Sequence, residues 1–169
     1  MTIVAYQREC LFGEIVDGEM RLSKYGKIVQ KWWNEIPNHF PNVEVIAFVI
    51  MPNHVHGIIL IIDERRGTGT VPNVDEEFLQ SNGISTNRGG MTPPLRKPTL
   101  GQVVAYFKYQ STKEMNRLDG TGAITKFWQR NYYERIIRNE NEMAKIWDYI
   151  ETNPLNWADD NENPLNIQQ

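Results

Sequence analysis

The chain has 169 residues, a net charge of −3 and a hydrophobic fraction of 40%. This length and composition are typical of one soluble globular domain with a packed core. No apolar run reaches the roughly 18 residues that a bilayer span requires, and no signal peptide is expected. Cys10 is the single cysteine, so the sequence allows no internal disulfide and favours a cytoplasmic location.

Charge is distributed unevenly along the chain, although the net charge by itself argues against a nucleic-acid partner. Residues 95–138 contain nine Lys or Arg and three acidic residues, whereas residues 139–169 contain seven acidic residues and one Lys. Aromatic residues are interleaved with the basic ones, and this combination suits a phosphate backbone with stacked bases. A solvated charged face over an ordinary aromatic core explains the same composition.

The first part of the chain predicts a strand, a hairpin and a helix. A short strand is expected over residues 2–7, followed by a hairpin over residues 12–22 with Asp17-Gly18 as its turn. Ser23 is expected to cap a helix whose apolar residues recur with helical spacing over three turns. Pro37 is expected to end this helix.

Two strands are predicted next, over residues 43–50 and 54–62, and their short connection favours an antiparallel pair. Residues 63–98 then contain many Gly and Pro among polar residues, without a sustained period. A segment of this length and composition predicts a flexible insertion in the domain.

A helix, a strand and another helix are expected after the insertion. Thr99 begins a capping-box pattern, and the helix that follows is expected to end at Gly120. Residues 126–138 are rich in aromatic and β-branched residues, which predicts a strand. Asn139 is expected to cap a last helix that stops before Pro154.

Without the hairpin, this order of elements is βαββαβ followed by one helix. It predicts an α+β fold of the ferredoxin-like or RRM-like type, in which helices cover one face of an antiparallel sheet. The N-terminal hairpin and the C-terminal helix, which carries Tyr149, are additions to this pattern. We expect one domain over residues 1–158 and a loose polar tail over residues 159–169.

His54 and His56 lie two residues apart at the start of a predicted buried strand. Alternate side chains of a strand share a face, so the two imidazoles are expected to point the same way. Nitrogens placed in this way can converge on one metal ion at roughly 2.1 Å. Histidines satisfied by core or surface partners, or ligands of an unrelated metal hydrolase, are the alternatives.

Tyr149 and Asn153 lie four residues apart near the end of the last predicted helix, so both project from one side of it. If that side faces the histidines, a nucleophile and an oxygen ligand join the nitrogen pair. A boundary tyrosine and a helix-terminating asparagine are the simpler interpretation. The sequence has no cysteine cluster, no Gly-rich phosphate loop before a helix, no His-Glu-x-x-His and no Gly-x-Ser-x-Gly.

Three segments in this order carry a family resemblance: Met51 to His56 (MPNHVH), Phe127 to Asn139 (FWQRNYYERIIRN) and Trp147 to Pro154 (WDYIETNP). Together they closely resemble the single-tyrosine HUH transposases. The chain is most similar to the REP-associated tyrosine transposases, relatives of the small insertion-sequence transposases that act on single-stranded DNA. The resemblance extends from the 12–22 hairpin to Pro154 and implies the same ferredoxin-like fold.

The resemblance also implies a role for each candidate residue. His54 and His56 match the metal ligands of the HUH motif, with Mg²⁺ or Mn²⁺ as the implied ion. Tyr149 matches the nucleophile. Asn153 matches a Gln or Asn position that completes the metal site. The first strand is shorter at its amino end than in many relatives, and residues 63–98 have no role that can be transferred.

The implied activity is that of a metal-dependent single-stranded DNA endonuclease and strand transferase, as in DNA transposition and recombination. It would act on hairpin-flanked, REP-like sites through a 5′-phosphotyrosine intermediate, and a monomer is favoured over a homodimer. The candidate DNA-binding residues are Arg96, Lys97, Lys108, Lys126, Trp128, Arg130, Tyr132, Tyr133, Arg135 and Arg138.

Two alternatives stay open on the sequence alone. One is a non-catalytic DNA- or RNA-binding protein on the same fold. The other is a metal-dependent phosphoesterase that uses water in place of a tyrosine. Tyr132 and Tyr133 are also rival nucleophiles on the residues alone, although the resemblance favours Tyr149.

Overall fold

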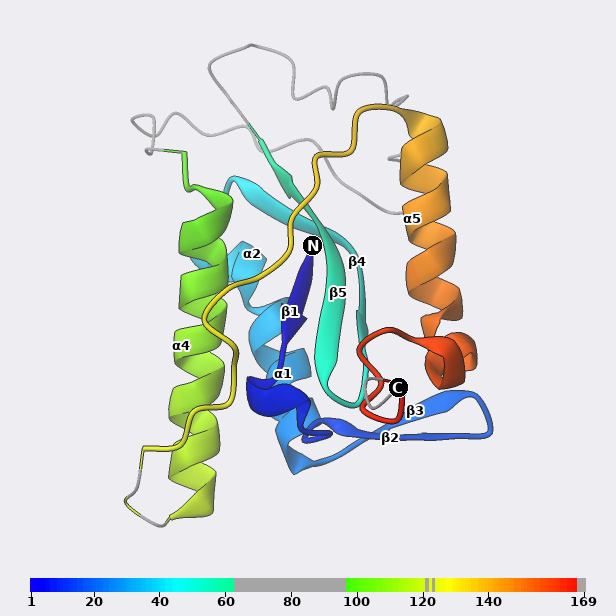
Figure 1. Ribbon diagram of the computed structural model, residues 1–169. Coiled ribbons are helices and arrows are strands. Elements are labelled where there is room, and N and C mark those ends of the chain that lie inside the picture. The colour runs from blue at the N-terminus through cyan, green and yellow to red at the C-terminus, as the bar shows by residue number, and fades with distance from the viewer. Residues whose placement is uncertain (63–96, 121, 123, 167–169) are drawn as a thin grey trace.

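A computed structural model describes residues 1–62, 97–120, 122 and 124–166 (Figure 1). The predicted insertion lies outside the described residues, except at its last two positions. The strands are β1 (Thr2–Val4), β2 (Gly13–Val16), β3 (Glu19–Leu22), β4 (Val43–Ile50) and β5 (His54–Ile61). The helices are α1 (Lys24–Asn34), α2 (Ile36–His39), α4 (Leu100–Asp119) and α5 (Glu140–Thr152), with short 3₁₀ helices η1 (Tyr6–Arg8) and η3 (Asn153–Asp159).

The central sheet is antiparallel and has the order β1-β5-β4. Strands β2 and β3 form a separate hairpin, with Asp17 and Gly18 in left-handed backbone conformations at its turn. This geometry is the one that a two-residue hairpin loop requires. The predicted α+β class and the predicted hairpin are therefore confirmed.

The predicted helix starts are confirmed by their caps. The Ser23 side chain accepts hydrogen bonds from two backbone amides of the first turn of α1. Thr99 forms a reciprocal capping box at the start of α4, and Asn139 accepts from a backbone amide of α5. These contacts satisfy donors that a helix start otherwise leaves open. Within the described ranges, no helix is both long and apolar enough to cross a bilayer.

The two faces of the central sheet are covered by different helices (Figure 1). Helices α1 and α4 pack on one face, where Trp33 and Phe107 are fully buried. Helix α5 packs on the other face, where Met143 and Ile150 contact Ile58 of β5. The sheet is thus a central layer between two sets of helices, and α5 lies on the side of the histidines.

Gly57 allows α1 to pack closely on one face of β5, while the histidines of the same strand point to the other face. A Cβ atom on Gly57 would lie 2.2 Å from the Trp33 ring, so the close approach of α1 requires glycine there. Because strand side chains alternate, the neighbours His54 and His56 point to the opposite face, toward α5. The shared orientation predicted for the two histidines is the one that the structure has.

The segment that was predicted as a strand over residues 126–138 is not a regular strand. Tyr133 pairs with Thr2 of β1, and Trp128 pairs with Ala5, the residue directly after β1, each through an isolated antiparallel bridge. Between them, the Lys108 ammonium donates to the carbonyl oxygens of residues 129–131 at distances between 2.8 and 3.3 Å. Because these carbonyls turn toward a side chain, the regular ladder of hydrogen bonds is interrupted. Residues 127–133 therefore lie beside β1 as an irregular strip.

The chain after α5 also differs from the prediction. Asn153 keeps helical backbone angles (φ −56°, ψ −42°) although Pro154 follows it, and η3 continues the turn. The described part of the predicted loose tail is packed against the domain. Asn163 is only 5% exposed, and Glu162 forms an ion pair of 2.7 Å with Arg8. Residues 167–169 lie outside the described residues.

Candidate metal and nucleophile site

The candidate site lies where the amino end of β5 meets the carboxyl end of α5 and the chain that follows it. A pocket of about 360 Å³ opens there. Its lining combines hydroxyl, imidazole, amide and carboxylate groups: Thr2, His56, Tyr133, Tyr149, Asn153, Asn156, Asp159, Asp160, Asn161 and Glu162.

His54 and His56 approach each other through the same ring atom. Their Nε2 atoms are 2.9 Å apart, and the ring planes are inclined by 73°. Two ligands bound at a right angle to one ion, each at roughly 2.1 Å from it, are separated by about 3.0 Å. The nitrogen pair is therefore at the spacing of adjacent ligands of a metal ion.

Asn53 determines which nitrogen of His54 faces this point. Its side chain is fully buried, and its Nδ2 donates to the carbonyl oxygens of Arg8 at 3.0 Å and of Glu162 at 2.7 Å. Its Oδ1 is thereby directed at His54 Nδ1, 2.8 Å away, and accepts the hydrogen of that nitrogen. His54 Nε2 therefore keeps its lone pair, as a metal ligand requires.

The Nδ1 atom of His56 also has a partner, because Thr2 Oγ1 of β1 lies 2.8 Å from it. Both rings are thus held through Nδ1, the ring nitrogen that does not belong to the close Nε2 pair. Such outer contacts fix the orientation of metal-binding imidazoles.

Two oxygen donors complete the candidate ligand set. Asp160 Oδ2 lies 3.9 Å from His54 Nε2, and the candidate ligand atoms of Asp160, His54 and His56 all lie within 4.8 Å of one another. Asn153 lines the pocket at 2% exposure, and its Oδ1 has no hydrogen-bond partner. A buried polar atom without a partner costs about 1–3 kcal/mol, and a cation would satisfy it. Two nitrogens and two oxygens so placed fit a divalent metal ion.

Burial keeps both imidazoles uncharged near neutral pH. It lowers the pKa of His54 to about 4. It also lowers the pKa of His56 to about 3, where the neighbouring His54 adds to the lowering and the Asp160 carboxylate opposes it. Because a protonated ring cannot bind a metal, this environment favours the ligand form of both histidines.

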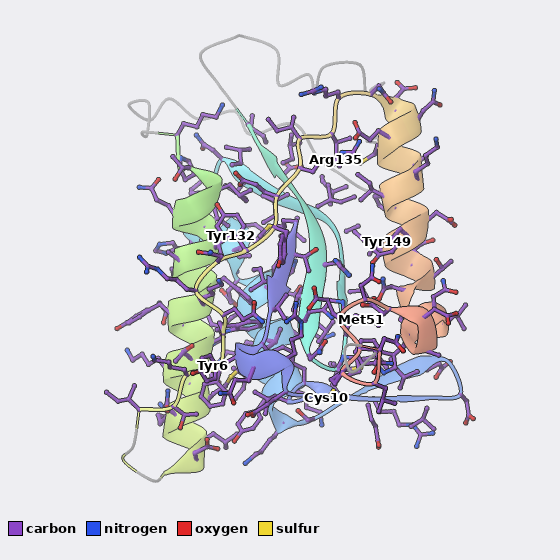
Figure 2. All side chains as sticks on the ribbon, in the orientation of Figure 1. Tyr6, Cys10, Met51, Tyr132, Arg135 and Tyr149 are labelled. Atoms are coloured by element: carbon purple, nitrogen blue, oxygen red, sulfur yellow. The ribbon has the colours of Figure 1, made fainter. Side chains whose placement is uncertain are left out.

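Tyr149 brings a hydroxyl to the same point. The residue is 49% exposed on the side of α5 that is turned toward the sheet (Figure 2). Its Oη lies 3.3 Å from His56 Nε2. Burial and the charge of Asp160 raise the pKa of Tyr149, whereas a hydrogen bond from Asn153 lowers it. The phenol is therefore protonated at neutral pH and requires activation to act as a nucleophile.

The structure thus brings together the four residues of the predicted metal and nucleophile site, two from β5 and two from the end of α5 and the start of η3, which are far apart in the chain. The arrangement combines a candidate ion site with the hydroxyl of a half-exposed tyrosine. Chemically, such a set can activate an oxygen nucleophile against an anionic substrate held by the ion.

The candidate DNA-binding residues fall into different environments. Trp128 is 8% exposed and packs between aromatic rings of the core, so its ring is not open for stacking. Tyr132 is half-buried against the core beside Lys108, whose ammonium is held by backbone carbonyls. The exposed candidates are Lys97, Lys126, Arg130, Tyr133, Arg135 and Arg138. Arg96 lies outside the described residues.

Asp160 and Asn53 are site residues that the sequence did not single out. Asn53 lies directly before His54 in the MPNHVH segment, and this adjacency was the available signal. Asp160 belongs to the acidic stretch that was predicted to be a loose tail, where nothing in the local pattern distinguishes it from Asp159.

The fold and site define an α+β protein with a buried histidine pair beside a helix-borne tyrosine. The chain is 38% identical to an uncharacterized protein of Haemophilus influenzae over 160 residues, which are 95% of this chain and 81% of that protein. The chain belongs to the same family as this protein. No family model and no solved structure matches the sequence.

Proposed function

We propose that the protein is a metal-dependent single-stranded DNA endonuclease and strand transferase, a REP-associated member of the single-tyrosine HUH transposases. One observation supports this proposal above the others. Tyr149 Oη lies 3.3 Å from an imidazole nitrogen that belongs to a ligand-spaced pair. A tyrosine nucleophile beside a metal site suits attack on a phosphodiester.

The arrangement of the sheet supports the ferredoxin-like assignment. The strip over residues 127–133 lies beside β1, so the order across the sheet is this strip, then β1, β5 and β4. Helices α1 and α4 pack on one face of the sheet. A split βαββαβ unit has this kind of arrangement, to which the hairpin and α5 are added.

His54, His56, Asp160 and Asn153 would hold the ion. Imidazole nitrogens suit transition metals, whereas carboxylate and amide oxygens suit Mg²⁺ and Mn²⁺. Mn²⁺ accommodates both kinds of donor, so we expect it to bind more tightly than Mg²⁺. When bound, the ion would stabilise the negative charge that develops on the scissile phosphate.

Tyr149 would carry out the cleavage step. Its Oη forms a bond to phosphorus while the bond from phosphorus to the 3′ oxygen breaks. The phenol loses its proton and the released oxygen gains one, which gives a 5′-phosphotyrosine and a free 3′-hydroxyl. Attack by another 3′-hydroxyl reverses the step and joins two strands, so the energy of the broken bond is preserved. Because all these groups belong to one chain, we propose that a monomer is sufficient.

The test is covalent capture of DNA. Labelled single-stranded REP-type hairpin oligonucleotides are incubated with the protein in Mn²⁺ or in EDTA, and the products are separated on a denaturing gel. We expect a metal-dependent covalent band that is lost in Tyr149→Phe and in His54→Ala. Tyr109→Phe is the matched control, since it removes an exposed phenol from α4. Cleavage that survives in Tyr149→Phe would contradict the tyrosine mechanism and favour attack by water.

A further inference from the structure

Tyr133 occupies a defined place at the edge of the candidate site. It is 60% exposed and lines the pocket together with His56 and Tyr149. The register of the sheet sets its direction, because Tyr133 pairs with Thr2 and Thr2 pairs with His56. Directly paired residues of antiparallel neighbours point to the same face. The Tyr133 ring therefore lies in one row with the Thr2 hydroxyl and the His56 imidazole.

The backbone that carries this ring is held firmly. Tyr133 donates its amide hydrogen to the Thr2 carbonyl oxygen at 2.9 Å, and its own carbonyl accepts from the Thr2 amide at 2.8 Å. Upstream, the Lys108 ammonium holds the carbonyls of residues 129–131. An exposed ring on a fixed backbone loses little conformational freedom when a ligand packs on it.

The neighbouring aromatic residues are occupied elsewhere. Tyr132 lies on the side of α4 (Figure 2), and the Lys108 ammonium sits over its ring at 5.8 Å from the centroid. Trp128 is buried and donates its indole hydrogen to Ser111 Oγ at 3.0 Å. Of the aromatic residues in the described strip, Tyr133 is the one that lines the pocket.

The charge of the pocket indicates which part of a nucleotide Tyr133 meets. Asp159, Asp160 and Glu162 all line it. Carboxylates repel phosphates, so the sugar-phosphate backbone of a DNA strand that enters the pocket can be held there only at the metal ion. The rest of the strand must be held through its bases. The face of a nucleobase is uncharged and stacks well on an aromatic ring. A pocket of about 360 Å³ is within the usual size of a small-ligand site.

We propose that Tyr133 is the stacking platform for the nucleobase next to the scissile phosphate. This inference rests on the proposed function and assigns a substrate contact of the same site. In a duplex both faces of a base are covered by its neighbours, so an unpaired base is the one that can stack on the ring. Tyr133 would thereby favour cleavage at an unpaired position beside a hairpin.

The test is a binding experiment in the Tyr149→Phe background, where no covalent product forms. Affinity for a fluorescent REP-type hairpin oligonucleotide is measured by anisotropy in Mn²⁺, while a single abasic position is moved along the flanking strand. We expect one position at which loss of the base weakens binding about fivefold to a hundredfold. Adding Tyr133→Ala is expected to weaken binding to the intact strand equally and to abolish the abasic effect. Tyr133→Phe keeps the ring and is expected to bind like the parent, as is the control Tyr109→Ala.

The outcomes separate this proposal from the function on which it rests. If the Tyr149→Phe parent binds no hairpin at all, both proposals are overturned. If the parent binds and its abasic effect persists unchanged in Tyr133→Ala, the stacking role alone is overturned. Equal thermal unfolding of Tyr133→Ala and Tyr133→Phe would show that a loss of binding in Tyr133→Ala reflects the ring and not the fold.

Discussion

Asn53 connects a candidate ligand to two distant parts of the chain. Its amide holds the carbonyls of Arg8 and Glu162, and its oxygen holds His54. Arg8 and the preceding Gln7 both have a positive φ, near +55°, which is unfavourable for residues other than glycine. Backbone strain of this kind persists only where surrounding contacts impose it, and Asn53 supplies one of them.

We expect Asn53→Ala to weaken both folding and metal binding. Two partly buried carbonyls lose their donor, so the free energy of unfolding should fall by about 1–3 kcal/mol in urea titrations. His54 loses the partner that fixes its ring, so calorimetric Mn²⁺ affinity should fall by roughly 10–100-fold. Ser111→Ala is the control, since it removes the buried acceptor of Trp128 away from the site. Equal losses of Mn²⁺ affinity in both variants would contradict a positioning role for Asn53.

Asp160 offers a sharper test of the ligand set. We expect Asp160→Asn to lower Mn²⁺ affinity at least about tenfold, or roughly 1.4 kcal/mol, without loss of stability in EDTA. The reason is that the carboxylate contributes to ion binding and pairs with uncharged imidazoles when no ion is bound. Asp159→Asn removes the same charge from the same pocket at an exposed position and should leave the affinity within about twofold. Equal effects of the two substitutions on Mn²⁺ affinity would show that Asp160 acts only through its negative charge and is not a ligand.

The sequence predicted those site residues that are close to one another in the chain. The spacing of His54 and His56 on a strand, and of Tyr149 and Asn153 on a helix, fixes their shared direction. That the two pairs meet was implied by family resemblance and not by spacing. Asn53 and Asp160 were missed because their contacts join parts of the chain that come together only in the folded domain. The Asn53 bond to Glu162, for example, spans 109 positions.

The strip over residues 127–133 shows where composition fails to predict an element. Aromatic and β-branched residues predict a strand because they pack well on a half-buried surface. Here Phe127 and Trp128 are buried, while the backbone forms two isolated bridges, one with Thr2 of β1 and one with Ala5 directly after it. Lys108 binds the carbonyls that a regular ladder would have used. A side chain from α4 thus outweighs the strand propensity of these residues, and the sequence of the strip itself does not indicate this contact.

We expect Lys108→Met to loosen this strip. Loss of the ammonium leaves the partly buried Gln129 carbonyl without this donor, so the free energy of unfolding should fall by about 1–2 kcal/mol. Native-state hydrogen exchange should show faster exchange at the amides of Gln129 and Tyr133, which bond to β1. Lys113→Met, at an exposed position of the same helix, should change neither quantity. Unchanged exchange in Lys108→Met would show that the bridges alone hold the strip.

The buried histidine pair makes the folding stability of the whole domain depend on pH. Both rings are uncharged in the folded protein at neutral pH, with pKa values lowered by burial to about 4 and about 3. In the unfolded chain they titrate near the ordinary value of 6.5. The unfolded state therefore binds more protons below that pH. Stability is fully present above pH 6.5 and is lost progressively as the pH falls toward 4.

This coupling predicts acid sensitivity of the metal-free protein. In EDTA, we expect the free energy of unfolding to fall steadily between pH 6.5 and pH 4, measured by urea denaturation at closely spaced pH values. The double variant His54→Gln, His56→Gln should show a clearly smaller slope over this range. His39→Gln, which replaces the histidine of α2 outside this pair, is measured beside them. The same slope in all three proteins would assign the acid response to other groups.

The overall architecture was more accessible from the sequence than the site. Hydrophobic periodicity, helix caps and the Asp17-Gly18 turn predicted the α+β class, the helix starts and the hairpin, because each of these is specified locally. The packing of the last described residues against the domain was not predictable in this way. Polar residues such as Asn163 are buried there by contacts with the turn of η3 and not by an apolar pattern.

The tyrosine mechanism is tested most directly by finding which residue becomes linked to DNA. Wild-type protein is incubated with a cleavable hairpin oligonucleotide and Mn²⁺, treated with nuclease and protease, and mapped by mass spectrometry. We expect a nucleotide phosphodiester on Tyr149 and none on Tyr133, although both line the pocket. EDTA should abolish the adduct. An adduct on Tyr133, or strand cleavage with no protein adduct, would contradict Tyr149 as the nucleophile.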